Sequence, residues 1–456
     1  TVSALALNAG VDMDMVSEGF VGTLMKSIKE GKVRMGTLNT ACRRILEAKY
    51  KLGLFSDPYK YCDTLRVEKE LYTTAHRAVA RKIAAETFVL LKNEDHLLPL
   101  ERKGKIALIG PMADARNNMC GMWSMTCTPS RHGTLLEGIR SAAGDKAEIL
   151  YARGSNIYHD AELEKGGAGI RPLERGNELQ LLDEALHTAA RADVIVAALG
   201  ECAEMSGESA SRTELGIPDA QQDLLKALVK TGKPVVLLLF TGRPLVLNWE
   251  DANVHSILNV WFGGSETGDA IADVLFGKVT PGGKLTTTFP RSVGQLPLYY
   301  NHLNTGRPDP DSHSFNRYSS NYLDMSNEPL YPFGYGLSYT NFSYGNLQLS
   351  SDVLSKNGEL TVSVTVTNDG DFDGYEIVQM YLHDIYAEIS RPVKELKGFE
   401  RIFLKKGESR EVKFVITEDD LRFYNSGLQY VYEPGEFDVM VGANSRDVQT
   451  ERFRAD

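Results

Sequence analysis

The residues with the clearest potential for chemistry lie in a short acidic loop. Residues 200–213 contain Glu201, Glu204 and Glu208, and they follow an apolar run at 193–199 that predicts a buried parallel strand. In open α/β sheets, ligands bind beyond the carboxyl ends of the strands, where loops converge on a crevice. Carboxyl groups held there could act in catalysis, and Glu208 is our candidate catalytic residue.

Several motifs accompany this loop, and together they carry a resemblance to a known family. They are TGKPVVLLL at 231–239, GRPL at 242–245, WFGGSETG at 261–268, PGGKL at 281–285 and YPFGYGLSY at 331–339. With the acidic loop, the chain resembles family 3 of the glycoside hydrolases, and within it the bacterial periplasmic β-glucosidases. The resemblance runs in order over essentially all 456 residues.

The acidic loop needs a rigid scaffold, and the surrounding sequence predicts one. Short apolar strands are expected at residues 105–110, 147–152, 194–200, 234–240 and 256–262, alternating with helices such as 178–192 and 220–231. This alternation predicts a three-layer α/β sandwich with a largely parallel sheet. A longer helical segment at 70–91 is expected to lead into it.

The two ends of the chain predict different architectures. Residues 11–15 are expected to form a short strand followed by helices at 20–31 and 38–52, and they resemble the last strand of the family's (β/α)8-type barrel. Towards the other end, residues 360–368, 376–383, 409–416 and 435–442 alternate with period two between turn signals. With the resemblance, these strands imply a fibronectin type III-like β-sandwich.

These patterns divide the chain into four expected parts, and the fold class is α/β plus all-β. Residues 1–57 are the end of the barrel, and 58–289 are the α/β sandwich domain that carries the acidic loop. Residues 290–343 are a long connecting segment, and 344–456 are the fibronectin type III-like domain. Most of the barrel is expected to lie upstream of this chain.

The resemblance implies retaining cleavage of a glycosidic bond. That reaction needs two carboxyl groups about 5 to 5.5 Å apart, one to attack the anomeric carbon and one to protonate the departing oxygen. Carried over residue by residue, the family's general acid and base falls on Glu208, while Glu201 and Glu204 compete for this role. The family's nucleophile, an Asp in a Ser-Asp-aromatic motif, has no counterpart here and is expected to precede residue 1.

Trp123 is the candidate substrate-binding residue. Its segment, residues 120–125, resembles a Gly-Trp segment that in related plant exo-glucanases places an indole against the sugar beyond the cleavage point. An indole face suits the apolar C–H face of a pyranose ring. The alternative is a tryptophan of the hydrophobic core, and the sequence does not separate the two.

Two further sets of residues are left open. The five cysteines contain no CxxC pair, so neither a zinc site nor a complete disulfide framework follows; Cys120 and Cys127 are either paired across a loop or free buried thiols. Asp12 and Asp14 lie in the segment that resembles the last barrel strand. We interpret Asp12 as structural and leave Asp14 undecided.

Composition excludes some classes of partner. The formal net charge of −11 disfavours nucleic acid, and the longest apolar runs fall far short of the roughly 20 residues that span a bilayer. The glycine-rich segment at 263–270 fails the test for a nucleotide-binding loop because Asp269 stands where a phosphate-binding lysine would be. No cofactor or metal is therefore expected. The resemblance implies a periplasmic or secreted protein. The oligomeric state is left open, with a homodimer as one alternative.

The leading functional hypothesis is a retaining, exo-acting β-glucosidase that releases terminal non-reducing β-D-glucosyl residues. Its substrate would be an oligosaccharide or another β-glucoside, and this chain alone would be catalytically incomplete. Two alternatives remain. One is a non-catalytic carbohydrate-binding or accessory module, and the other is the same fold acting on β-xylosides or other β-glycosides.

Overall fold

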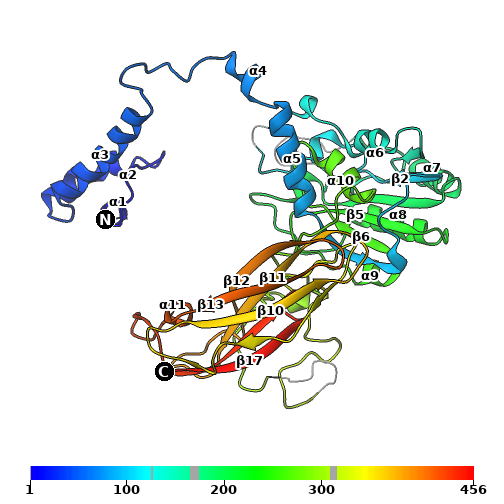
Figure 1. The fold of residues 1–456 in the computed structure, drawn as a ribbon. Helices are drawn as coiled ribbons and strands as arrows, with labels where there is room; N and C mark the ends of the chain where they lie inside the picture. Colours follow the sequence, from blue (N-terminus) through cyan, green and yellow to red (C-terminus); the bar gives the residue numbers. More distant parts are fainter. Residues whose placement is uncertain (1, 125–126, 165–173, 309–315) are drawn as a thin grey trace. The chain divides into compact units, whose positions relative to one another are not determined.

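The structure is a computed structural model that describes residues 2–124, 127–164, 174–308 and 316–456. The chain divides into two compact units, Thr1–Thr73 and Thr74–Asp456. Figure 1 shows the elements of both units in chain order, and each unit is considered by itself below.

The first unit is helical. It contains α1 (Val2–Asn8), α2 (Gly19–Lys29), α3 (Met35–Lys51) and α4 (Arg66–Glu70). Its small core consists of buried apolar side chains of the first three helices and the turn before α3: Ala4, Leu7, Leu24, Val33 and Ala41. The helices expected at 20–31 and 38–52 are present as α2 and α3.

The strand expected at residues 11–15 is wrong, because this segment has no regular structure. A parallel strand is stable only when neighbouring strands take up its backbone hydrogen bonds. The described residues of this unit form no strand that could do so. The apolar side chains of Val11, Met13 and Met15 are accordingly exposed.

The second unit begins with a three-layer α/β sandwich, as the sequence predicted. Its six-stranded sheet has the order β1-β6-β5-β4-β2-β3. The strands are β1 (Val89–Asn93), β2 (Lys105–Ile109), β3 (Glu148–Ala152), β4 (Val194–Gly200), β5 (Val235–Phe240) and β6 (Ser256–Asn259). β2 to β6 pair in parallel, whereas β1 pairs with β6 in the antiparallel sense.

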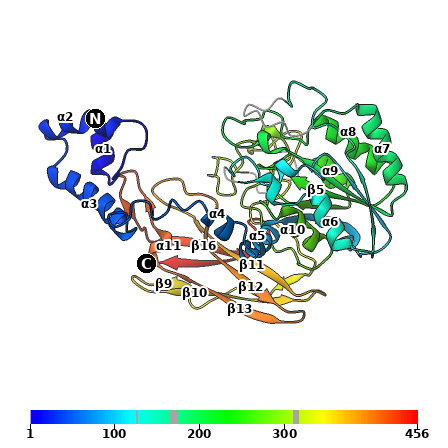
Figure 2. The same ribbon diagram turned by 90° about the horizontal axis from the view of Figure 1, so that it is seen from above.

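Helices cover both faces of this sheet (Figure 2). On one face α5 (Thr74–Thr87), α6 (Leu135–Ala143) and α10 (Thr267–Leu275) pack into one apolar core. On the other face α7 (Glu178–Ala190) and α8 (Asp219–Val229) pack into a second. A short helix, α9 (Asn248–Asn253), precedes β6. The central strands β4 and β5 are buried on both faces, which explains their continuous apolar sequences.

The helix expected at 70–91 is too long at its carboxyl end. α5 stops at Thr87, and residues 89–91 belong to β1. Phe88, Val89, Leu90 and Leu91 are all buried. Four consecutive buried side chains fit an edge strand packed between two layers better than an amphipathic helix, which buries only one stripe.

The remainder of the second unit is a β-sandwich, which confirms the all-β part of the predicted fold class. One sheet has the order β13-β10-β7, with β8 also on β10, and the other has the order β12-β11-β16-β17-β9. The principal strands are β10 (Leu360–Asn368), β11 (Gly374–Asp384), β12 (Glu395–Leu404), β13 (Ser409–Ile416), β16 (Gly435–Gly442) and β17 (Val448–Ala455). The short ones are β7 (Phe342–Tyr344), β8 (Gln348–Leu349), β9 (Val353–Leu354), β14 (Phe423–Tyr424) and β15 (Tyr430–Val431), with α11 (Glu418–Leu421) before β14.

A buried ion pair joins the two sandwiches. Lys284 Nζ lies 3.2 Å from Glu376 Oε1 at the start of β11; the Glu376 side chain is 4% exposed and the Lys284 side chain 10%. Lys284 Nζ also donates to the carbonyl of Gly336 at 2.9 Å, and the Tyr344 hydroxyl donates to Glu376 at 2.9 Å. Burial, together with the Glu376 carboxylate, raises the pKa of Tyr344. The four domain boundaries given above remain predictions.

This ion pair generates a stability prediction. Replacing Lys284 by Met leaves the Glu376 carboxylate buried without its cation, so the free energy of unfolding should fall by about 3 to 5 kcal/mol. The matched control is Lys406→Met, because Lys406 pairs with Asp371 on the surface and should matter by less than about 1 kcal/mol. Urea unfolding measures both, and equal losses would contradict a special role for the buried pair.

Candidate active site

Glu208 lies at the exposed tip of the loop that follows β4. The loop starts with a single 3-10 turn, Ala203–Met205, and then reverses direction around Glu208. Gly207 has φ +116° and Ser209 has φ +59°, so both neighbours of Glu208 have left-handed backbone conformations. Only glycine adopts the first without strain, and a serine in the second is held there by its surroundings. The Glu208 carboxylate therefore projects from a constrained turn.

A buried carboxylate fixes the base of this loop. Glu201 is fully buried; one of its oxygens lies 2.8 Å from Arg212 Nη1 and 3.0 Å from Arg243 Nε. Its other oxygen accepts from the Thr241 hydroxyl at 2.9 Å and from the Gly242 amide at 3.0 Å. We call Glu201, Arg212, Thr241 and Arg243 the Glu201 network. Since both oxygens of Glu201 are engaged, this carboxylate has no free face for a substrate.

Arg243 connects the Glu201 network to the loop on both sides of Glu208. Arg243 Nη2 donates to the carbonyl of Met205, which precedes Glu208, and to that of Ala210, which follows it, at 2.8 Å for the latter. Arg212 Nη2 donates to the carbonyl of Gly216 at 3.1 Å, farther along the loop. The position of Glu208 thus depends on a guanidinium from the end of β5.

Glu204 differs from Glu208 in its environment. It is half-buried, and burial raises the pKa of its carboxyl group. Its Oε1 atom is enclosed and makes no hydrogen bond within the part of the chain that the structure describes. Glu204 therefore favours the protonated form, but this oxygen faces protein rather than solvent. Of the three glutamates, Glu208 is the one whose side chain is exposed.

Trp123 lies beside the Glu208 loop, although the two are distant in sequence. A Cβ atom built on Gly207 would come within 3.0 Å of Met122 Cγ and 3.9 Å of Trp123 Cε2, so these side chains rest against the glycine. Asn118 Oδ1 accepts from the Ala203 amide at 2.8 Å and ties the two loops together. The Trp123 side chain is 73% exposed, which excludes the alternative of a core tryptophan in this chain. Its contact with a sugar remains a prediction.

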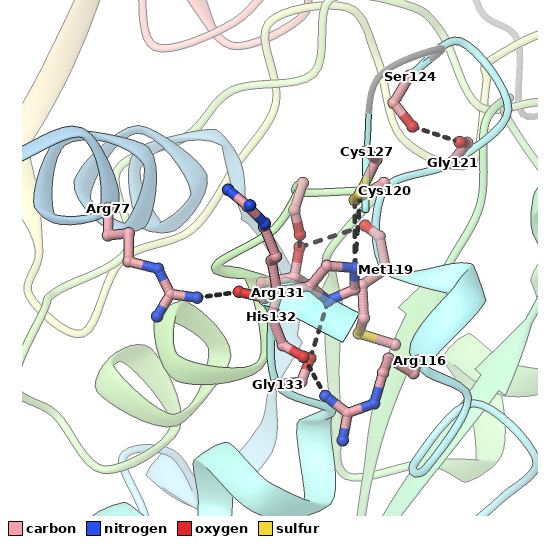
Figure 3. Close-up of a disulfide and its surroundings, with 12 residues drawn as sticks. Arg77, Arg116, Met119, Cys120, Gly121, Ser124, Cys127, Arg131, His132 and Gly133 are labelled. Atoms are coloured by element: carbon pink, nitrogen blue, oxygen red, sulfur yellow. Dashed lines mark hydrogen bonds between the residues drawn. A yellow bond between two sulfur atoms is a disulfide. The ribbon is translucent and has the colours of Figure 1, made fainter. Parts of the chain in front are cut away.

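Cys120 and Cys127 form a disulfide, which settles the alternative left open by the sequence (Figure 3). The two sulfurs and His132 Nε2 lie within 4.8 Å of one another, a grouping typical of metal sites. Sulfurs joined in a disulfide lack the thiolate charge that a metal ligand needs. Cys202 is a free thiol in the core, and burial raises its pKa to about 12.

The two aspartates of the first unit have structural partners. Asp14 accepts hydrogen bonds from the Ser17 hydroxyl at 2.5 Å and the Phe20 amide at 2.9 Å, at the beginning of α2. These two hydrogen bonds lower the pKa of Asp14. Asp12 forms an exposed ion pair with Arg44 at 3.1 Å. Both carboxylates therefore have local partners, and Asp14 accepts from an amide in the first turn of α2, where a negative charge is favourable.

The sequence missed one part of the site. Arg243 stands in the GRPL motif at 242–245, yet neither periodicity nor local spacing indicates that its side chain reaches the loop after β4. The signal that could have found it is its position immediately after a predicted buried strand. Parallel strands end at one edge, so residues just beyond β4 and β5 are expected to meet there.

The chain was compared with protein families and known proteins. Residues 88–339 match the glycosyl hydrolase family 3 C-terminal domain, and residues 376–445 match the fibronectin type III-like domain. Within the described residues, no helix combines the length and the apolar character that crossing a bilayer requires.

Curated relatives carry glycosidase names. A periplasmic β-glucosidase of Salmonella typhimurium is 47% identical over 98% of this chain and 59% of that protein. A β-xylosidase of Formosa agariphila is 39% identical over 97% of this chain and 59% of that protein. The chain spans about three fifths of the length of these relatives.

Solved structures agree. A β-glucosidase of Listeria innocua in complex with isofagomine has a TM-score of 0.86 and 37% sequence identity, with 99% of this chain and 60% of that chain covered. A β-glucosidase of Bifidobacterium adolescentis has a TM-score of 0.79 and 29% identity over 99% of this chain and 63% of that chain. With a family match over more than half its length and a fold shared with these enzymes, the chain belongs to family 3 of the glycoside hydrolases.

Proposed function

We propose that this chain is part of a retaining, exo-acting β-glucosidase that hydrolyses terminal non-reducing β-D-glucosyl residues. The observation that supports this most directly is the exposed Glu208 carboxylate on a loop that the Glu201 network holds at the carboxyl end of β4. The substrate would be an oligosaccharide or another β-glucoside. The 47% identity with a periplasmic β-glucosidase supports a periplasmic or secreted location.

In this proposal Glu208 works twice. It first donates its proton to the glycosidic oxygen while a second carboxylate attacks the anomeric carbon, so that the aglycone leaves as a neutral alcohol. It then removes a proton from the water that hydrolyses the glycosyl-enzyme ester, and the attacking carboxylate is released. The second carboxylate, an aspartate, would come from sequence upstream of residue 1.

A second candidate substrate is a β-xyloside, because a β-xylosidase is 39% identical over nearly all of this chain. Xylose lacks the hydroxymethyl group of glucose, so the choice depends on the space around that group. The non-catalytic alternative predicts that no form of the protein turns over either sugar.

The first test compares three proteins on aryl β-glucosides and aryl β-xylosides. They are this chain, a version extended upstream to the length of the relatives, and the extended version with Glu208→Gln. We expect substantial activity only in the extended protein with Glu208 intact, and for Glu208→Gln a loss of about 10²- to 10⁴-fold in kcat/KM on aryl glycosides with poor leaving groups. Turnover by this chain alone would contradict an upstream nucleophile.

Leaving-group chemistry separates an acid catalyst from a structural residue. With a dinitrophenyl glucoside, whose departing oxygen hardly needs a proton, the first step in Glu208→Gln should be nearly normal, and added azide should raise turnover by attacking the glycosyl-enzyme without a base. The matched control is Glu204→Gln, which should resemble the wild type with both good and poor leaving groups and should gain no turnover from azide. Azide rescue in Glu204→Gln instead would move the acid role to Glu204.

Arg243 should act as a positioning residue for Glu208. Arg243→Lys keeps a cation near Glu201 but loses the Nη2 group that donates to both the Met205 and the Ala210 carbonyls, so we expect kcat to fall about 10²-fold on substrates with poor leaving groups. Arg212→Lys is the control, since Arg212 contacts Glu201 but neither of those carbonyls. Equal losses of kcat in the two variants would indicate a stability effect alone, which thermal unfolding would reveal.

Trp123 is proposed to bind the sugar beyond the cleavage point. Trp123→Ala should raise KM for a β-linked glucose disaccharide about tenfold, with a smaller change in kcat, because the lost contact is made before the bond breaks. Trp123→Phe should restore part of the affinity. An unchanged KM in Trp123→Ala would exclude the contact.

A further inference from the structure

We propose that the Cys120–Cys127 disulfide holds Glu208 in position and that its reduction by a dithiol, through thiol–disulfide exchange, releases Glu208. This proposal rests on the proposed role of Glu208 as the acid and base. The pair closes a short ring in the chain, with a sequence separation of seven residues, and Met122 and Trp123 lie inside that ring.

The ring is packed against the Glu208 loop on one side. Met122 lies so close to Gly207, the residue before Glu208, that a Cβ atom there would lie 3.0 Å from Met122 Cγ, and Trp123 Cε2 would be in ordinary contact with that Cβ at 3.9 Å. On another side, a Cβ atom on Gly121 would lie 2.8 Å from Phe262 Cβ, which shows that the ring also rests on the segment after β6. Gly121, Met122 and Trp123 therefore lie between the loop after β4 and the segment after β6. Movement of these residues would therefore also move the turn that carries Glu208.

His132 gives the disulfide a polar neighbour with a defined orientation. Its side chain is buried, and Nε2 lies 3.7 Å from Cys120 Sγ and 3.5 Å from Cys127 Sγ. Nδ1 lies 3.2 Å from the carbonyl of Gly133, to which it can donate. That hydrogen bond places the lone pair of a neutral imidazole on Nε2, towards both sulfurs.

The frame around His132 does not depend on the disulfide. Arg116 donates to the His132 carbonyl and forms an ion pair with Glu137 at 2.5 Å. Glu137 in turn belongs to the capping box of α6 with Thr134. Arg77, on α5, donates to the carbonyl of Arg131. Figure 3 shows Arg77 and Arg116 at the backbone carbonyls of Arg131 and His132. Opening the disulfide would free the ring while this frame stays in place.

The exchange reaction balances with a dithiol as the reductant. One thiolate of the dithiol attacks a sulfur of the pair, the Cys120–Cys127 bond breaks, and the other cysteine leaves as a thiolate. The second thiol of the reductant then displaces the first cysteine and closes a cyclic disulfide. Two electrons and two protons pass to Cys120 and Cys127, and Nε2 of His132 can accept a hydrogen bond from either new thiol.

The test uses the full upstream-extended protein with dithiothreitol as the dithiol. Hydrogen exchange is followed by mass spectrometry in peptides covering residues 203–210, with β13 as an internal reference. We expect reduction to accelerate exchange in 203–210 by about tenfold and to leave β13 unchanged, since local opening and global unfolding are separable in this measurement. The Cys120→Ser/Cys127→Ser variant should match the reduced protein and no longer respond to dithiothreitol.

Activity is a separate readout. Reduction should lower kcat severalfold with poor leaving groups and less with a dinitrophenyl glucoside, as expected when the acid is displaced. Cys202→Ser is the control for the buried thiol and should respond like the wild type. If 203–210 exchanges at the same rate after both thiols are shown to be free, or if the protein isolated without reductant has no disulfide, the proposal is wrong. Because the exchange readout needs no turnover, a failure of the proposed function would leave it interpretable.

Discussion

The buried charge of Glu201 is the interaction on which the site depends. A carboxylate without exposure is tolerated only when cations and hydrogen-bond donors surround it. Its partners come from the loop after β4 (Arg212) and from the end of β5 (Thr241, Gly242 and Arg243). The fold must therefore bring these strand ends together before the carboxylate can be buried, and the same contacts shape the Glu208 turn. The position of the exposed Glu208 is thus a consequence of the contacts made by the buried Glu201.

Two glycines make this convergence of strand ends possible. Gly110, just after β2, and Gly200, the last residue of β4, have φ values of +138° and +130°. A Cβ atom would lie 2.1 Å from the Ala198 carbonyl oxygen at the first position and 2.0 Å from the Phe240 carbonyl oxygen at the second. A side chain at either site would push adjacent strands apart at the ends from which their loops begin. Close backbone approach, rather than flexibility, is the reason for glycine there.

The sequence predicted the elements that have a clear local pattern. Its predictions failed where contacts with other parts of the fold decide whether a segment forms a strand. β4 and β5 are buried on both faces, so their unbroken apolar runs identify them. Residues 11–15 have the composition of a strand but no described partner to pair with. The sequence did not predict β12, because its first seven residues are not buried and therefore show no period-two alternation of apolar side chains. Glu208 could be found from its motif, whereas Arg243 could not, because the carbonyls that it holds belong to a different strand connection.

The exposure of Glu208 has a mechanistic consequence. An acid catalyst must hold its proton until the bond breaks, and a carboxyl group does so when it is buried or when another carboxylate lies close by. Within this chain, burial is supplied to Glu204 rather than to Glu208. Under the proposed function, the groups that keep Glu208 protonated must therefore come from outside this chain, and they include the bound sugar and the attacking carboxylate. This division of labour suits a residue with two tasks: once the ester has formed, the negative charge of the nucleophile is gone, and Glu208 can lose its proton and act as the base.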